Sequence, residues 1–217
     1  MRIERAALAA GRSAAEVSLL AVSKTFPASY IEDAFSAGQR AFGESYAQEG
    51  VKKITSLASL AIDWHFIGPV QSNKTAPIAE HFEWVHAVDR AKIATRLNAG
   101  RPAALPPLNV CIQVNVSGEG SKSGVAPGEE RELAHAIAAL PRLRLRGLMA
   151  IPEPTPDTAL QRLRFALLRE LKDGLVAEGH MLDTLSMGMS DDLEAAIAEG
   201  ATIVRVGTAI FGRRETL

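Results

Sequence analysis

Eight short apolar segments alternate with longer amphipathic segments along nearly the whole chain. The strand-like segments are residues 18–22, 40–43, 62–67, 84–88, 108–116, 143–149, 184–187 and 202–206. Stretches with helical spacing lie between them, at residues 29–37, 44–57, 73–81, 90–99, 128–140, 158–178 and 191–199. Strands that alternate with helices form βαβ units with a parallel sheet. Eight such units predict an α/β fold of the (β/α)8, TIM-barrel type, with residues 1–217 as a single domain.

The main alternative is an open, doubly wound sheet, which usually carries a phosphate loop after its first strand. The sequence contains no G-x-G-x-x-G and no Walker motif, and the glycine-rich residues 118–124 lack Gly-Lys at the required spacing. Residues 190–192, Ser-Asp-Asp, are expected to accept backbone N–H bonds at the start of the last long helix. Four glycines follow helical stretches, where a residue with positive φ is expected: Gly38, Gly100, Gly179 and Gly200.

Charge and composition exclude several classes of protein. The net charge is -1, and no basic stretch predicts binding to nucleic acid or to a membrane surface. No apolar run is long enough to span a bilayer, and the charged residues 2–5 are unlike a signal peptide. Cys111 is the single cysteine, so no internal disulfide can form and a cytoplasmic location is expected. We expect a monomer.

Lys24 follows the first predicted strand, in the sequence Ser23-Lys24-Thr25. In a parallel barrel the functional residues lie where the strands end. Apolar surroundings favour the neutral form of an amine, and a neutral lysine is the nucleophile that forms a Schiff base. The alternative is a solvated lysine at a strand end, and position by itself does not decide between the two.

The loops after the seventh and eighth predicted strands carry small and hydroxyl-bearing residues. These loops are the recurrent phosphate site of the barrel fold, and backbone N–H groups at a helix start favour an anion. In the alternative interpretation, Ser190 caps a helix and Gly207 only makes a turn. The candidates for phosphate binding are Ser186, Gly188, Met189, Ser190, Gly207 and Thr208.

Arg205 interrupts the apolar eighth strand. Alternation along a strand places it on the opposite face from Val204 and Val206. If those valines face the helices, Arg205 points into the barrel, where a buried guanidinium needs a partner. That partner is either a carboxylate of the barrel or an acceptor atom of a bound ring, and the spacing leaves both open.

Three further residues are weaker candidates for contact with a bound ligand. Each has a structural alternative: Ser45 could begin a helix, His65 could be a structural histidine in the third strand, and Asn73 could cap a helix. Cys111 is expected in the core. The histidines and the cysteine lack metal-ligand spacing, and their order suggests no Ser-His-Asp triad, so we assign neither a metal site nor a catalytic residue.

Six segments, spread in order over nearly the whole chain, match a known pattern. They are residues 20–25 (LAVSKT), 42–49 (FGESYAQE), 64–74 (WHFIGPVQSNK), 121–124 (SKSG), 185–190 (LSMGMS) and 204–212 (VRVGTAIFG). Together they resemble the pyridoxal phosphate homeostasis protein family, which is itself similar to the barrel domain of alanine racemase. The family sequesters pyridoxal 5′-phosphate (PLP) and supplies it to PLP-dependent apoenzymes, and it has no settled catalytic activity.

The resemblance implies a role for each main candidate. Lys24 matches the lysine that holds PLP as a Schiff base, and Arg205 matches the arginine that faces the pyridine nitrogen. An arginine there keeps the ring nitrogen largely unprotonated, which weakens the electron sink of the cofactor. The segments around Ser190 and Thr208 match those that hold the phosphate. The implied function is PLP binding for homeostasis.

Two other functions compete with this one. A PLP-dependent racemase of this fold needs a tyrosine as second base, and Tyr30 and Tyr46 are the only tyrosines. A lysine aldolase would need no cofactor, but it would not explain the segments at residues 185–190 and 204–212.

The chain also departs from the family pattern. Ser45 replaces the usual asparagine, the N-terminus is expected to be shorter, and some relatives carry a longer basic tail. Lys122 is a candidate for a second, transient aldehyde acceptor.

Overall fold

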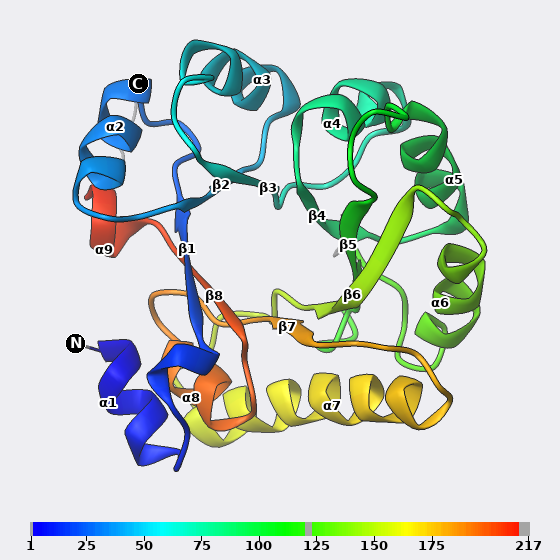
Figure 1. The fold of residues 1–217 in the computed structure, drawn as a ribbon. Coiled ribbons are helices and arrows are strands. Elements are labelled where there is room, and N and C mark those ends of the chain that lie inside the picture. Colours follow the sequence, from blue (N-terminus) through cyan, green and yellow to red (C-terminus); the bar gives the residue numbers. More distant parts are fainter. Residues whose placement is uncertain (1, 120–122, 213–217) are drawn as a thin grey trace.

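The computed structural model describes residues 2–119 and 123–212. Its strands are all parallel and close into a barrel in sequence order, with β8 returning to β1. Figure 1 shows the strands as an inner ring and the helices outside it. The strands are β1 (Ser18–Val22), β2 (Ala41–Glu44), β3 (Asp63–Phe66), β4 (Trp84–Val88), β5 (Leu108–Gln113), β6 (Leu143–Met149), β7 (Thr184–Ser186) and β8 (Ile203–Val206). The predicted barrel is therefore confirmed.

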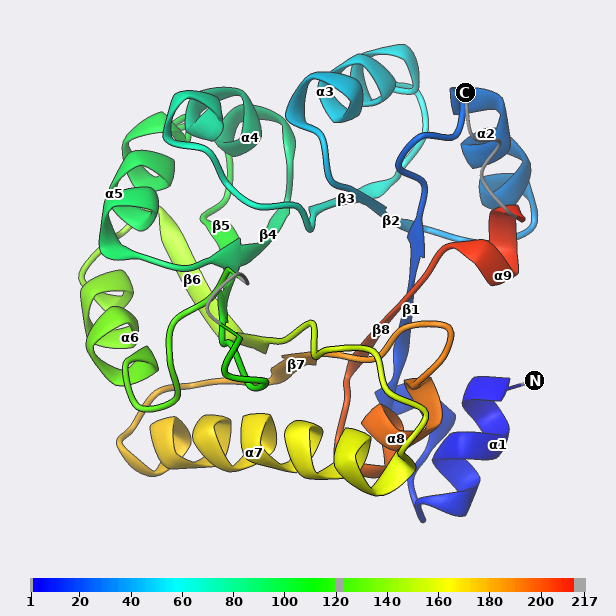
Figure 2. The ribbon, with the colours of Figure 1, turned by 180° about the vertical axis from the view of Figure 1, so that it is seen from behind.

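A helix follows each strand along the chain, and α1 precedes the barrel and packs beside α8 (Figure 2). The α-helices are α1 (Arg2–Ala9), α2 (Ala28–Ser36), α3 (Ala47–Ser56), α4 (Thr75–His81), α5 (Ala91–Gly100), α6 (Glu130–Ala138), α7 (Thr158–Ala177), α8 (Leu193–Ala198) and α9 (Thr208–Phe211). Two short 3-10 helices, Ala14–Glu16 and Ser72–Lys74, precede β1 and α4. The apolar core lies between the strands and these helices; its largest fully buried side chains include Phe42, Phe66, Phe82 and Phe165.

Capping explains the ends of the longest helix. Asp157 lies just before α7 and its carboxylate accepts from the backbone N–H groups of Ala159 and Leu160, which otherwise lack partners in the first turn. Gly179, just beyond the other end, has a φ of 97°, a conformation that residues with a Cβ rarely adopt. Gly38 and Gly200 also have positive φ, as predicted from the sequence.

The sequence predicted a positive φ at Gly100, and this prediction was wrong. Gly100 is the last residue of α5 and does not have a positive φ. A Cβ at this position would lie 3.1 Å from the Cα of Ala76 in α4. The glycine is therefore explained by the close approach of two helices.

The predicted fifth strand was too long. The strand β5 ends at Gln113. The N–H of Val114 still donates to the backbone oxygen of Met149 in β6, but Val114 lies in an isolated bridge with Val125. The Asn115 side chain then accepts from the N–H of Gly118 at 3.1 Å, a turn that competes with continued strand pairing. The strand-like pattern of residues 114–116 gave no sign of this turn.

We expect the exchange Gly147→Ala to destabilise the barrel. Gly147 lies in β6 opposite Thr184 of β7, and a Cβ there would lie 1.8 Å from the carbonyl oxygen of Thr184. The two strands would have to separate, so the free energy of unfolding should fall by about 3 kcal/mol, as measured by urea denaturation. The control is Gly174→Ala in α7, where the nearest atom is 3.5 Å away and a gain of about 1 kcal/mol is expected. Equal stability of the two variants would contradict the prediction.

Candidate functional site

A pocket of about 240 Å³ lies at the C-terminal mouth of the barrel, where the strands end. It brings together side chains from the loops after β1, β2, β3, β6, β7 and β8. Seven of the candidates from the sequence line it: Lys24, Ser45, Met189, Ser190, Arg205, Gly207 and Thr208. Val22, Ile67, Ile151 and Asp191 complete the lining. The lysine of the first loop and the loops after β7 and β8 thus meet in one cavity.

Lys24 sits in a tight turn directly after β1. The next residue, Thr25, has a φ of 69°. Within residues 2–119 and 123–212, it is the one non-glycine residue with a positive φ. Such a conformation is unfavourable for a β-branched residue. It is held in place by Glu49 of α3, whose carboxylate accepts from the Thr25 N–H at 2.6 Å. The backbone that carries Lys24 is therefore fixed from a neighbouring helix.

A buried lysine, Lys53 of α3, supports the same turn. Its Nζ donates to the backbone oxygen of Ser23 at 2.8 Å, and it pairs with Glu44 at 2.8 Å and with Glu49 at 2.6 Å. The Ser23 hydroxyl donates to the same Glu44 oxygen at 2.6 Å. We call Glu44, Glu49 and Lys53 the acidic clamp, because they hold the residues on both sides of Lys24.

The charge within the acidic clamp is costly to bury. The Glu44 side chain is fully buried, and its second oxygen, Oε2, has no hydrogen-bond partner. Burial raises the pKa of Glu44, while Lys53 and the Ser23 hydroxyl act in the opposite direction. A buried carboxylate without a charge partner would be strongly unfavourable. The stability of the acidic clamp, and of the turn that carries Lys24, therefore depends on Lys53.

Arg205 points into the barrel from β8, with 4% of its surface exposed. Its guanidinium donates to the backbone oxygen and the hydroxyl of Ser186, at 2.6 and 2.7 Å, and to the backbone oxygen of Ala150 at 2.8 Å. Burial lowers the pKa of Arg205 to about 10, so the group stays charged at neutral pH. A guanidinium has five N–H donors, and these contacts leave donors for a ligand in the pocket.

The loop after β7 needs a glycine at its first turn. Gly188 has a φ of 92°, and a Cβ there would lie 2.6 Å from the Cβ of Ala196 in α8. The carboxylate of Asp192 accepts from the N–H of Met189 at 2.6 Å. This bond folds the loop back on itself, so Asp192 does not cap the first turn of α8 as the sequence suggested.

Backbone donors of both phosphate-loop candidates remain available. Within the described part of the chain, the N–H groups of Ser190, Asp191, Thr208 and Ala209 donate to no protein acceptor. A Cβ on Gly207 would lie 3.2 Å from the backbone oxygen of Val22, so a side chain there would crowd the pocket wall. Free N–H groups beside a charged guanidinium suit an anion.

Four predicted site residues lie outside the pocket lining. Ser186 and His65 are buried inside the barrel, where Ser186 contacts Arg205 and His65 contacts His86. Gly188 shapes the loop below the pocket. Asn73 is exposed within the 3-10 helix Ser72–Lys74 and caps neither that helix nor α4. Lys122 lies outside the described residues.

Sequence reasoning missed the apolar part of the lining and the acidic clamp. Ile67 and Ile151 follow β3 and β6, so their place at strand ends was a usable signal, but only polar residues were considered there. The contacts of Lys53 with Glu44 and Ser23 join residues that are 9 and 30 positions apart in the sequence, and no local pattern predicts them.

A second cavity, of about 440 Å³, adjoins the pocket and shares Lys24, Ser45, Ile67 and Ile151 with it. Its other walls carry Tyr46, Ala47, Gln48, Phe66, Gly68, Pro69, Gln71 and Lys74. Lys24 therefore belongs to the walls of two neighbouring cavities.

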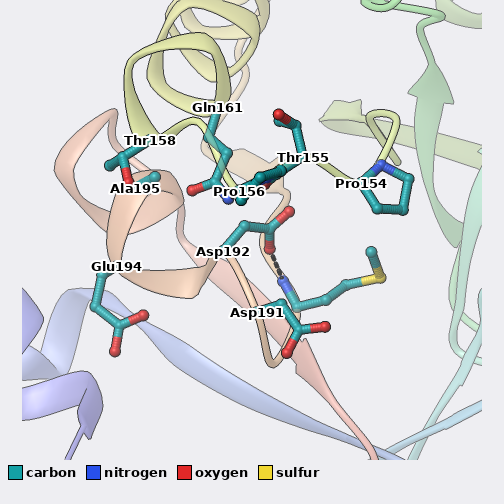
Figure 3. A pocket seen from close by; sticks show the side chains of 10 residues that line it. Pro154, Thr155, Pro156, Thr158, Gln161, Asp191, Asp192, Glu194 and Ala195 are labelled. Carbon is teal, nitrogen blue, oxygen red and sulfur yellow. Dashed lines mark hydrogen bonds between the residues drawn. The ribbon is translucent and has the colours of Figure 1, made fainter.

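A third cavity, of about 510 Å³, lies on the other side of the β7 loop and shares Met189 and Asp191 with the pocket. Figure 3 shows acidic side chains on its wall, including Asp191 and Asp192, with Gln161 and residues 154–156 opposite. The hydrogen bond from the Met189 N–H to the Asp192 carboxylate forms part of the boundary between this cavity and the pocket.

Other chemistries lack support among the described residues. The described residues include no cluster of three or more His, Cys, Asp or Glu that could bind a metal ion. Cys111 is buried, as predicted, and burial raises the pKa of its thiol to about 12, which makes it a poor nucleophile. None of the helices within residues 2–119 and 123–212 is long and apolar enough to cross a membrane.

Comparison with known proteins identifies the class first. The family model of the alanine racemase N-terminal domain matches residues 3–215. An alanine racemase from Corynebacterium glutamicum has a TM-score of 0.68 at 16% identity, covering 96% of this chain and 58% of that one, which shows a shared fold. The fold and the site thus define a barrel of the alanine racemase N-terminal type.

The particular family follows from nearer relatives. This chain is 65% identical to the pyridoxal phosphate homeostasis protein of Pseudomonas aeruginosa, over 99% of this chain and 92% of the relative. It is 57% identical to the protein of the same name from Escherichia coli K12, over 99% and 93%. The chain belongs to the pyridoxal phosphate homeostasis protein family.

A solved relative is available with and without a ligand. PipY from Synechococcus elongatus has a TM-score of 0.85 at 37% identity in its structure without PLP, and 0.84 at 36% identity in its structure with PLP bound. Each comparison covers 98% of this chain and 100% of PipY.

We expect the exchange Lys53→Met to destabilise the site. It removes the cation of the acidic clamp and leaves Glu44 buried without a charge partner, so the free energy of unfolding should fall by about 3 kcal/mol at pH 7. Urea denaturation measures this change. The matched control is Lys52→Met on the same helix, because Lys52 is exposed and should be nearly neutral. Equal losses in both variants would rule out a stabilising role for the clamp.

Proposed function

We propose that this protein binds PLP covalently through Lys24 and serves the intracellular homeostasis of PLP, by sequestering the cofactor and supplying it. The observation that carries the proposal is that one pocket is lined by the Lys24 amine, the Arg205 guanidinium and the two loops with free N–H groups. The names of the relatives and the PLP-bound structure of PipY support it.

The residues of the pocket fit the three polar parts of PLP. When bound, PLP supplies an aldehyde that captures amines and a ring that can accept electrons. The Lys24 amine suits the aldehyde carbon, to which it bonds with loss of water. Arg205 suits the ring nitrogen, which is an acceptor. The N–H groups near Ser190 and Thr208, with their hydroxyls, suit the phosphate oxygens.

Arg205 favours holding the cofactor over transforming amino acids. It is charged at neutral pH, so it would donate a hydrogen bond to the ring nitrogen of a bound PLP and disfavour protonation of that nitrogen. An unprotonated ring is a weaker electron sink than a protonated one. The charge of Arg205 thus binds the ring while lowering its reactivity, and we assign no catalytic residue to this chain.

The racemase alternative lacks a well-placed second base among the described residues. Tyr46 has 57% of its surface exposed and lines the second cavity, outside the pocket. Tyr30 lies on α2, with 46% exposed, and packs against Phe26. Neither tyrosine lines the pocket that holds Arg205, so an efficient two-base proton exchange is not supported.

The proposed physiological role follows from the reactivity of the aldehyde. Free PLP condenses with any exposed amine, so a cytoplasmic protein that binds it reversibly limits such reactions. We propose that PLP-dependent apoenzymes are the recipients and that the barrel acts as a single domain and as a monomer.

Borohydride trapping tests the ligand, the bond and the residue together. Reduction of the PLP-loaded protein should attach the cofactor to the peptide that contains Lys24, as read by mass spectrometry. The exchange Lys24→Ala should abolish trapping and the absorbance of the bound cofactor while the far-UV circular dichroism is unchanged. The matched control is Lys74→Ala, which removes a lysine from the adjoining cavity and should leave trapping intact.

Two results would contradict the proposal. A protein that gains no absorbance with added PLP would favour the aldolase alternative. Trapping of the cofactor on another lysine, in the Lys24→Ala variant and in the parent alike, would show that Lys24 is not the attachment site.

A further inference from the structure

A chain of hydrogen bonds crosses the interior of the barrel beneath the pocket. Arg205 donates to the Ser186 hydroxyl at 2.7 Å, and this hydroxyl lies 2.7 Å from His86 Nδ1. His86 Nε2 lies 2.9 Å from His65 Nδ1, and His65 Nε2 lies 3.1 Å from a carboxylate oxygen of Asp63. Since β4 and β7 are not neighbours in the barrel, the bond between His86 and Ser186 spans the lumen. We call these five residues the lumen chain.

The two ends of the lumen chain lie at opposite mouths of the barrel. Arg205 lines the pocket at the C-terminal mouth. Asp63 is the first residue of β3, at the N-terminal mouth, and 47% of its side chain is exposed. The three residues between them, His65, His86 and Ser186, are at most 3% exposed. The lumen chain therefore joins solvent on one side of the barrel to the guanidinium on the other.

The direction of the hydrogen bonds in the lumen chain follows from Arg205, which can only donate, and from the acceptors within reach of Ser186. The Ser186 hydroxyl accepts from Arg205, and among the described residues His86 Nδ1 is the one acceptor found for its own proton, so it donates there. His86 must then carry its proton on Nε2 and donate it to His65. His65 in turn carries its proton on Nε2 and donates it to Asp63, which accepts. A single polarity thus runs from the guanidinium to the carboxylate.

The surroundings of His86 favour its neutral form, mainly because the ring is buried. Burial, together with the neighbouring His65 and Arg205, holds the pKa of His86 well below its ordinary value. Trp84 of β4 stacks on the His65 ring with centroids 5.2 Å apart.

Other strands contribute further groups. Arg146 of β6 lies 4.6 Å over the Trp84 ring and pairs with Asp183 just before β7. Cys111 of β5 and Asp192 act on Arg205. Glu83, just before β4, interacts with Asp63.

We propose that His86 is a positioning residue for Arg205, and that His65 and Asp63 couple protonation at the N-terminal mouth to the guanidinium that faces the pocket. This inference rests on the proposed function, because it concerns the group that faces the PLP ring. His86 touches neither the pocket nor its ligand. It acts through Ser186, by accepting the hydroxyl proton and so leaving the oxygen of that hydroxyl to Arg205.

Protonation of His65 would reverse the chain. A doubly protonated His65 donates from Nδ1, so His86 Nε2 must accept and the His86 proton must move to Nδ1. Ser186 would then face two donors, Arg205 and His86, and its own proton would lose its acceptor in a buried place, which is unfavourable. Arg205 is therefore held best when His65 is neutral, and PLP should bind more weakly at low pH for this reason.

The test is a set of PLP titrations of the full-length protein, followed by the absorbance of the bound cofactor, between about pH 8 and about pH 5. At the upper pH the exchange His86→Leu should weaken PLP binding about fivefold, the equivalent of one hydrogen bond. The exchange His86→Asn should restore the affinity, because an asparagine oxygen can occupy the position of Nδ1 and accept from Ser186.

The pH profile separates positioning from a merely structural role. The His86→Asn variant cannot contact His65, so it should lose the additional weakening that the parent shows at low pH. The exchange Asp63→Asn should also change that weakening, since it removes the carboxylate at the end of the lumen chain that lies 3.1 Å from His65 Nε2. The matched control is Glu16→Gln, which removes an exposed carboxylate just before β1, outside the lumen chain, and should keep the parent profile.

The polarity of the lumen chain has a readout without PLP. In protein labelled with ¹⁵N at histidine, the nitrogen shifts at about pH 8 should show both His65 and His86 protonated on Nε2. A His86 protonated on Nδ1 would overturn the proposal, and so would pH profiles that superimpose for the parent, His86→Asn and Asp63→Asn. If the parent binds no PLP at all, the proposed function fails; normal binding with superimposed profiles refutes only the lumen chain.

Discussion

A charged guanidinium buried in the interior of a barrel must have its donors satisfied, and much of the site depends on how Arg205 meets this demand. Its bonds to Ser186 and Ala150 tie β8 to the ends of β7 and β6, two of the strands whose loops line the pocket. The same bonds set which way the guanidinium faces. The same three hydrogen bonds therefore position the Arg205 guanidinium and join the strands of the barrel.

The amine on the other side of the pocket is held by a different principle. Lys24 lies on a turn with an unfavourable backbone conformation at Thr25, and the acidic clamp of α3 and β2 supplies the contacts that offset this strain. Here a buried ion pair orders a loop, whereas Arg205 relies on neutral acceptors. The buried charges of the acidic clamp lie behind the residue that faces the pocket, whereas Arg205 is itself a buried charge that lines the pocket.

Much of the fold could be predicted from the sequence, because hydrophobic periodicity and the glycines that end helices are local features of the chain. The bounds of β1, β4 and β6 agreed with the apolar runs, and Gly38, Gly179 and Gly200 ended helices as expected. Lys24, Arg205 and the loops at Ser190 and Gly207 could be found because a parallel barrel places all strand ends at one mouth. The end of β5 could not, since the turn at Asn115 competes with a pattern that still looks like a strand.

What the sequence could not supply were contacts between distant segments. His65 was selected as a ligand contact from a motif, yet its neighbours are His86 inside the lumen and Asp63 at the N-terminal mouth. No periodicity relates His86 to Ser186, which is 100 positions away. The same holds for Glu49 and Thr25, whose bond depends on how α3 packs beside the first loop.

The position of Lys24 on the shared wall of two cavities has a consequence for how a bound molecule could leave. The phosphate group would be bound by the loops after β7 and β8. The second cavity reaches Lys24 from the loops after β2 and β3. An incoming amine could therefore approach the aldehyde carbon without displacing the phosphate from its donors. Retention of PLP and its transfer would then depend on separate parts of the protein. A tightly bound PLP could therefore still be transferred quickly to an incoming amine.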